Sequence, residues 1–181
     1  MEVRLLNLLE MMAIYDQYLV NDFPKEERKT KQQLKDLYKN ERYEAYVMEE
    51  EGEIRAYAFF FDITSKVQVL DYFAVTSAKR GQGYGGKMLS WIKEEKREES
   101  LILECEDPSF ASNTALKVEQ ERRIAFYLRH GLILSSVKVD VVGVHYVLLF
   151  FNKDQVNAPF QRELEETYKD FNKQLNREDR Q

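Results

Sequence analysis

The sequence predicts a single α/β domain built on a mixed, mostly antiparallel sheet of six to seven strands flanked by helices. The 181 residues are about one domain's length. Hydrophobic residues make up 44% of them and aromatic residues 13%, which supplies enough apolar surface for a folded core. Amphipathic helical patterns also alternate along the chain with runs of β-branched and aromatic residues.

The first 42 residues are predicted to form two helices. Apolar residues recur at helical spacing from Leu5 to Leu19 and stop before Pro24, where a proline favours a break. The charged stretch 25–42 keeps Leu34 and Leu37 on one side, as in a helix that lies over a core.

Strands are predicted from residue 43 onward. Residues 43–48, 54–61 and 67–75 are rich in β-branched and aromatic side chains, and we expect them to run antiparallel, with a turn at Gly52. The remaining pattern indicates further elements, which follow in chain order. They are a helix over 87–96, a strand over 100–106, a helix over 115–129, and a hairpin made by 132–142 and 145–151.

The residue pattern at the end of the chain predicts one more helix. Its apolar residues are spaced by three or four positions, at Phe160, Leu164, Tyr168, Phe171 and Leu175. The sequence therefore divides into a domain over 1–153 and a C-terminal amphipathic helix over 154–181. We expect this helix to cover the sheet of its own chain, and a contact in a homodimer is the alternative.

Charge and cysteine content exclude several classes of protein. Twenty-seven basic against 32 acidic residues give a net charge of −5, which argues against nucleic-acid and anionic-membrane binding. A single cysteine, Cys105, excludes an intrachain disulfide and a cysteine-rich zinc site, and His130 and His145 lie far from it. No metal site is predicted. The chain shows no secretion signal or membrane-spanning run, and we expect a cytoplasmic protein.

Four of the seven glycines fall within six residues, in the segment 80–86 that reads Arg-Gly-Gln-Gly-Tyr-Gly-Gly. Glycine lets a backbone approach a ligand closely, and the first turn of the following helix offers unpaired N–H groups and the positive end of its dipole. A tight connection without a ligand needs only one or two glycines. The segment therefore predicts a phosphate-binding loop.

The residue spacings of two known phosphate-binding motifs match this segment. The spacing G-x-G-x-x-G fits the dinucleotide fingerprint, with Glu104 or Glu106 about 20 residues further on. However, residues 76–80 separate the glycines from the preceding strand, and a βαβ start is missing. The spacing G-x4-G-K fits a nucleotide-binding P-loop, but Met88 stands where a magnesium-binding hydroxyl is required. Both interpretations are weaker alternatives.

A third spacing, Arg80-x-x-Gly83-x-Gly85, resembles the pyrophosphate loop of the GNAT superfamily of acetyl-CoA-dependent N-acetyltransferases. Their loop reads Gln/Arg-x-x-Gly-x-Gly/Ala after a strand. Residues 70–75 look like the family's central strand, and residues 122–132 look like its later helix. The order of elements also agrees over residues 1 to about 153. Two departures are that Leu132 replaces the usual Phe and that Gln120 stands where many members carry Asn.

The resemblance implies that acetyl-CoA is the cosubstrate. Backbone groups of Phe73, Ala74 and Val75 would pair with the pantetheine arm as if it were an added strand. Arg80 would lie near the pyrophosphate, and Gln120 would contact the cofactor. The backbone amides that would hold the pyrophosphate are those of Gly81, Gln82, Gly83, Tyr84, Gly85 and Gly86.

Acetyl transfer to an amine needs a neutral amine, a polarised thioester carbonyl and a proton for the departing thiolate. The resemblance implies that Tyr127 is the general acid, the alternative being a tyrosine that only packs. Asp71, Glu104 and Glu106 are candidates for the base, because strand alternation lets their carboxylates project from one face of each strand. Glu104 is preferred, and a relay through water remains open.

The sequence therefore predicts an N-acetyltransferase that moves the acetyl group of acetyl-CoA to a primary amine by direct attack. The acceptor would be a small molecule or a peptide. A non-catalytic CoA-binding or regulatory module is the alternative, and it predicts CoA binding with no amine-dependent release of thiol.

Overall fold

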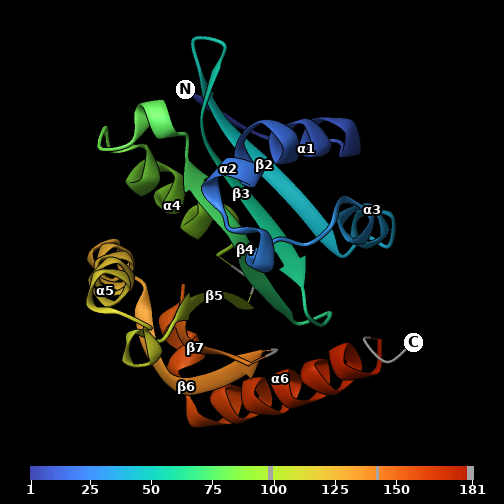
Figure 1. Ribbon diagram of the computed structural model, residues 1–181, viewed down its shortest axis with the longest axis vertical. Helices are drawn as coiled ribbons and strands as arrows, with labels where there is room; N and C mark the ends of the chain where they lie inside the picture. The colour runs from blue at the N-terminus through green and yellow to red at the C-terminus, as the bar shows by residue number, and fades with distance from the viewer. Residues whose placement is uncertain (98–99, 142, 179–181) are drawn as a thin grey trace. The chain divides into compact units, whose positions relative to one another are not determined.

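The computed structural model describes residues 1–97, 100–141 and 143–178 (Figure 1). They form two compact units, Met1–Asp62 with Leu70–Glu94, and Ile63–Val69 with Glu95–Gln181. The boundary passes through the strand β4 (Val67–Val75), which begins in the second unit and ends in the first.

Seven strands among the described residues follow the sheet order β1-β2-β3-β4-β5-β7-β6. The pairs β1–β2, β2–β3, β5–β7 and β7–β6 are antiparallel. The predicted fold class, an α/β fold on a mostly antiparallel sheet with flanking helices, is therefore confirmed. Besides β4 the strands are β1 (Glu2–Leu5), β2 (Tyr43–Glu50), β3 (Glu53–Asp62), β5 (Ser100–Glu106), β6 (Ile133–Val141) and β7 (Val144–Phe150). The residue at which the predicted strand 132–142 ends lies outside the described residues.

Six α-helices are found in the described parts of the chain. Their bounds are α1 (Leu8–Ile14), α2 (Val20–Asp22), α3 (Lys31–Lys39), α4 (Tyr84–Glu95), α5 (Thr114–Arg129) and α6 (Ala158–Glu178). A π-helical turn over Tyr15–Leu19 joins α1 to α2. Across the residues that can be described, no helix combines the length and the apolar character that crossing a membrane requires.

The start of the first helix differs from the prediction. The helix begins at Leu8 instead of near Leu5, and Glu2–Leu5 forms the strand β1. Asn7 causes this boundary, because its side chain accepts hydrogen bonds from the amide of Glu10 while the Glu10 carboxylate accepts one from the Asn7 amide. The regular spacing of leucines concealed a short strand that has no pattern of its own.

Helices cover both faces of the sheet in the first unit. On β3, Tyr57 faces Tyr18 of the π-helical turn, with 6.4 Å between ring centroids. Phe60, three residues further along β3, points the other way and contacts Tyr46, whose ring lies 5.0 Å from that of Trp91 on α4. This alternation places α1 to α3 on one face and α4 on the other.

In the second unit, α6 packs on β6 and α5 packs against β5. The apolar side of α6 is buried at Leu164 and Tyr168, and Phe160 lies with its ring 5.8 Å from that of Phe150. The side chains of Phe171 and Leu175, which the sequence also assigned to this apolar side, lie outside the described residues.

Candidate active site

The glycine-rich loop joins β4 to α4 in the first unit. Gly81 and Gly83 have φ angles of +77° and +83°, and a Cβ at either position would meet nothing within 4 Å. Glycine is therefore needed there for the backbone conformation and not for lack of space. The helix α4 begins at Tyr84, earlier than the predicted residue 87, so Gly85 and Gly86 lie in its first turn.

The backbone amides of this loop are available to a ligand. Lys87 donates the first bond of α4, from its amide to the carbonyl of Gly83 at 3.1 Å. The amides of residues 81–86 donate no hydrogen bond to any part of the chain that the structure describes. Six amides that lack acceptors, next to the positive end of the α4 dipole, are donors of the kind that could hold an anion.

Arg80 connects the loop to two other elements. Its Nη2 lies 2.7 Å from Oδ1 of Asp22, a side chain that is only 8% exposed, and its Nε donates to the carbonyl of Val75 at 3.3 Å. Asp22 also accepts the hydroxyl of Tyr57 at 2.8 Å. Burial and this hydrogen bond raise the pKa of Tyr57 far above its usual value, so its phenol remains a donor. Arg80 thereby ties the end of β4 to α2.

Two further contacts hold the loop against the β2–β3 hairpin. The hydroxyl of Tyr84 donates to Oε2 of Glu50 at 2.5 Å, a hydrogen bond that raises the pKa of Tyr84, and the guanidinium of Arg55 lies 5.7 Å from the Tyr84 ring centroid. Lys79 forms an ion pair with Glu53 at 2.9 Å. Side chains at positions 79, 80 and 84 therefore fix a loop whose own amides stay open.

The last residues of β4 include the segment predicted to pair with pantetheine. Phe73, Ala74 and Val75 are half-buried. Asp71, one of the predicted bases, receives Lys29 Nζ at 2.7 and 2.8 Å on its two oxygens, and the hydroxyl of Tyr43 donates to Oδ2. Its carboxylate is thus held by a cation and a phenol from the same unit.

In the second unit, α5 places Tyr127 and Gln120 on one face, because seven residues make almost two full turns. Both side chains are buried. Burial, with a smaller contribution from Cys105, raises the pKa of Tyr127 well above its ordinary value, so its phenol carries its proton at neutral pH. Oε1 of Gln120 is buried and accepts no hydrogen bond from the described part of the chain. A buried amide oxygen of this kind would be satisfied by a donor on a ligand.

The two glutamates of β5 have different partners. The hydroxyl of Tyr168, from α6, donates to Oε1 of Glu104. Oε2 of Glu106 lies 3.8 Å from Nη1 of Arg123 on α5. The contact of Tyr168 with Glu104 was not predicted, because nothing in the helical pattern of α6 separates Tyr168 from a residue that only packs.

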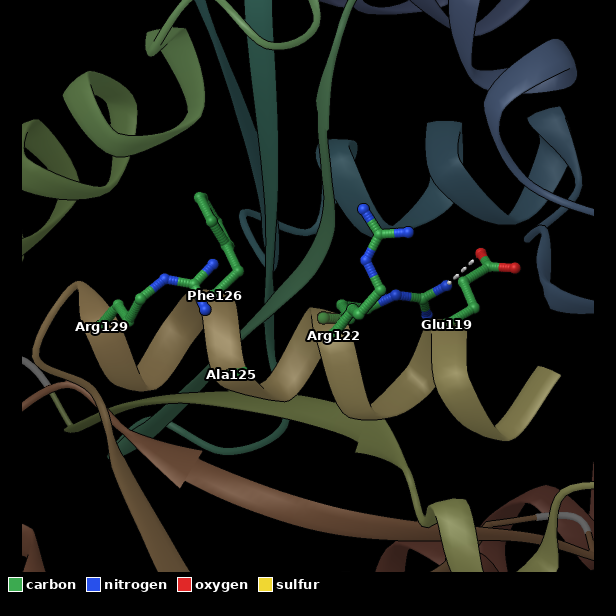
Figure 2. A pocket seen from close by; sticks show the side chains of 6 residues that line it. Glu119, Arg122, Ala125, Phe126 and Arg129 are labelled. Atoms are coloured by element: carbon green, nitrogen blue, oxygen red, sulfur yellow. Dashed lines mark hydrogen bonds and ion pairs between the residues drawn. The ribbon is translucent and has the colours of Figure 1, made fainter. Parts of the chain in front are cut away.

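An open pocket of about 500 Å³ lies along α5 (Figure 2). Figure 2 shows its side chains extending from one side of the helix. Arg123 is paired with Glu119 at 3.3 Å, whereas Arg122 and Arg129 form no ion pair with any described residue. Together with the ring of Phe126 they make a pocket suited to an anion with an apolar part. The helical spacing of residues 122, 126 and 129 was the feature of the sequence that could have indicated this pocket.

The contacts of Cys105, His130 and His145 indicate structural roles and no part in catalysis. Burial raises the pKa of the Cys105 thiol to about 12, so it stays protonated and is a poor nucleophile. Nδ1 of His130 lies 2.8 Å from the carbonyl of Phe126 at the end of α5, and His145 lies 3.1 Å from Asp140. Within the described residues, no three His, Cys, Asp or Glu side chains are grouped as a metal ion would require.

The mixed sheet with flanking helices and a glycine-rich loop before α4 has the element order that the sequence resemblance implied, and comparison with known families agrees. The model of the acetyltransferase (GNAT) domain matches residues 41–131, half of the chain. This protein therefore belongs to the GNAT family of acetyltransferases, and the resemblance seen in its sequence is confirmed.

Individual relatives support the same assignment. The chain is 28% identical over 157 residues to a Bacillus subtilis protein named "Putative acetyltransferase YjbC", covering 82% of this chain and 76% of the relative. Among solved structures, a GNAT-family protein from Bacteroides thetaiotaomicron superposes with a TM-score of 0.69 at 20% identity, over 91% of this chain and 96% of that one. The structure of yncA from Salmonella typhimurium with its cofactor acetyl-CoA gives 0.58 at 19% identity, over 83% and 92%. These structures show that the fold is shared.

Proposed function

We propose that this protein transfers the acetyl group of acetyl-CoA to a primary amine of a small molecule or peptide. The observation that carries the proposal is the run of amides at residues 81–86, which have no acceptor within the described chain, at the start of α4 in a member of the GNAT family. Backbone amides bind a diphosphate without a basic surface, which accounts for an acidic chain that uses an anionic cosubstrate. The related fold of yncA, solved with acetyl-CoA, supports this choice.

Several side chains have roles in binding under this proposal. Backbone groups of residues 73–75 pair with the pantetheine arm, and Gln120 accepts a hydrogen bond from one of its amides through the unsatisfied Oε1. Arg122 and Arg129 neutralise phosphate charge. Arg80 acts through the loop, since its guanidinium is already bound by Asp22.

The chemistry needs one acid and one base. The amine attacks the thioester carbonyl, the carbon–sulfur bond breaks, and the thiolate takes the phenolic proton of Tyr127, which burial keeps in place at neutral pH. The amine gives its proton to a carboxylate directly or through water. Glu104 is the first candidate for this base and Asp71 the second. No covalent acyl-enzyme is needed, which agrees with the buried, protonated thiol of Cys105.

The experiment combines a binding test with a turnover test. CoA, NAD and ATP are compared for their effect on thermal unfolding, because a ligand selective for the native state stabilises it. Release of free thiol from acetyl-CoA is then followed across alkylamines, polyamines, aminoglycosides and peptide N-termini. We expect CoA to stabilise most and at least one amine to accelerate thiol release. Stabilisation by CoA without amine-dependent release would instead identify a non-catalytic CoA-binding module.

A further inference from the structure

The ammonium group of Lys29 lies in a site built for a cation. Its Nζ is 2.7 Å from Oδ1 and 2.8 Å from Oδ2 of Asp71. The same nitrogen lies 5.2 Å from the ring centroid of Phe61 and 5.6 Å from that of Tyr72. A carboxylate combined with two aromatic faces is the chemistry by which proteins recognise alkylammonium ions.

Aromatic side chains form the walls of this site. Tyr43, Phe61 and Tyr72 are all buried, and the Tyr43 and Phe61 rings lie 6.3 Å apart. Tyr43 donates its hydroxyl to Asp71. Burial and the Asp71 charge raise the pKa of Tyr43 well above its ordinary value, so the Tyr43 phenol remains a hydrogen-bond donor to Asp71.

The backbone of Lys29 is held independently of its side chain. Its amide donates to the hydroxyl of Tyr72 at 2.8 Å, and its carbonyl accepts the hydroxyl of Tyr15 at 3.0 Å. Tyr72 also donates to the carbonyl of Glu27 at 3.0 Å. These backbone hydrogen bonds do not involve the ammonium, so the side chain can leave the site without breaking them. The Lys29 side chain is 27% exposed, and this leaves solvent access to the site.

We propose that Asp71, Tyr43, Phe61 and Tyr72 form the binding site for the primary ammonium group of the acceptor, and that Lys29 fills it when no acceptor is bound. This inference rests on the proposed transferase function. The position of Asp71 supports the location, because it lies two residues before Phe73, the start of the segment proposed to pair with pantetheine. The acceptor class is then an unbranched alkylamine, such as a polyamine or a lysine side chain, and the bound ammonium gives its proton to Asp71 or to water before its nitrogen attacks the thioester.

The first test asks whether the emptied site binds n-butylammonium chloride. Lys29→Ala should gain a saturable rise in melting temperature of roughly 2–4 °C beyond that given by sodium chloride at equal concentration. The wild-type protein and Lys29→Arg should show no such rise, because the side chain at position 29 fills their sites. Adding Asp71→Asn to Lys29→Ala should abolish the gain. Lys31→Ala is the matched control, because Lys31 also pairs with a carboxylate, Asp16, and lies 5.9 Å from a tyrosine ring, but both partners of that pair are exposed.

The second test uses turnover. Removal of an internal competitor should lower the KM for butylamine roughly tenfold in Lys29→Ala and leave the KM for acetyl-CoA unchanged. An absence of saturable stabilisation in Lys29→Ala, or an unchanged KM for butylamine, overturns the proposal. If Lys29→Ala does not fold, Lys29→Met keeps the aliphatic stem and is judged by the same two criteria.

Titration of these variants with CoA separates this inference from the proposed function. Binding of butylammonium without binding of CoA keeps the ammonium site and removes the transferase role. Binding of CoA without binding of butylammonium removes the ammonium site and keeps the transferase role.

Discussion

The two units of the molecule carry their candidate site groups in different ways. The first presents backbone amides at residues 81–86, in a loop held by ion pairs and hydrogen bonds from Lys79, Arg80 and Tyr84. The second presents side chains from one helix, with Tyr127 and Gln120 buried and Arg122 and Arg129 exposed. The first arrangement depends on glycine conformation and the second on burial and charge, so different substitutions should impair them.

The largest effect is expected from Gly83→Glu. A carboxylate beside the proposed diphosphate should reduce affinity for acetyl-CoA by roughly a thousandfold, because opposed like charges cost several kcal/mol. Calorimetric titration measures this. Gly143→Glu is the control, since Gly143 has a φ of +81° with nothing within 4 Å of a Cβ and bears the same backbone strain in the β6–β7 turn. Equal losses in the two variants would show that strain, and not the loop, is responsible.

Tyr127→Phe comes next and tests the buried side of α5. Loss of the phenolic proton should lower kcat by roughly a hundredfold, with the KM for acetyl-CoA nearly unchanged. Tyr46→Phe, which removes a phenol bonded to Glu44 on β2, serves as the matched control in the same kinetic assay. An unchanged kcat in Tyr127→Phe would show that Tyr127 only packs and is not the general acid.

A third prediction concerns the connection from β5 to α5. Burial alone would raise the pKa of Asp107, but hydrogen bonds from Lys138 at 2.7 Å and from Ser109 outweigh it and lower the value to about 2. Because the folded pKa lies below the unfolded one, this stabilisation is complete above about pH 5 and disappears as the pH falls towards 2. Asp107→Asn should therefore cost about 2 kcal/mol at pH 7 and little near pH 2. Denaturant unfolding at several pH values measures it, and a constant difference would contradict it.

The smallest effect is expected on the exposed side of α5. Replacing both Arg122 and Arg129 with Gln should weaken acetyl-CoA binding about tenfold and reduce its dependence on salt, because solvent screens these charges. Lys117→Gln, on the same helix but outside the pocket, should change neither quantity. If the double variant binds acetyl-CoA as the wild type does, the pocket serves another anion.

The sequence predicted best where a local pattern decides the structure. The bounds of β4 and β5 agree with the predicted 67–75 and 100–106, because polar residues frame two apolar runs. The glycine cluster indicated its loop for the same reason, since positive φ angles are a local property. The strand β1 was missed because its four residues adjoin a stronger helical pattern.

Partners that lie far apart in the chain could not be predicted. Asp71 receives Lys29 from 42 residues away, and Glu104 receives Tyr168 from 64 residues away. Both carboxylates were proposed as bases on strand alternation alone. Alternation places a side chain on one face of a strand but does not identify the residues that it contacts. The alternation rule gave their direction, and only the assembled fold gave their neighbours.

The left-handed backbone conformation of Gly81 and Gly83 has a consequence for chemical synthesis. A D-amino acid prefers the left-handed backbone that both positions adopt. A semisynthetic protein with D-alanine at position 81 should therefore keep the loop's shape and lose unfolded-chain entropy, which raises stability by roughly 0.4–1 kcal/mol. The extra methyl group would then report, through CoA affinity alone, how closely the diphosphate approaches the main chain.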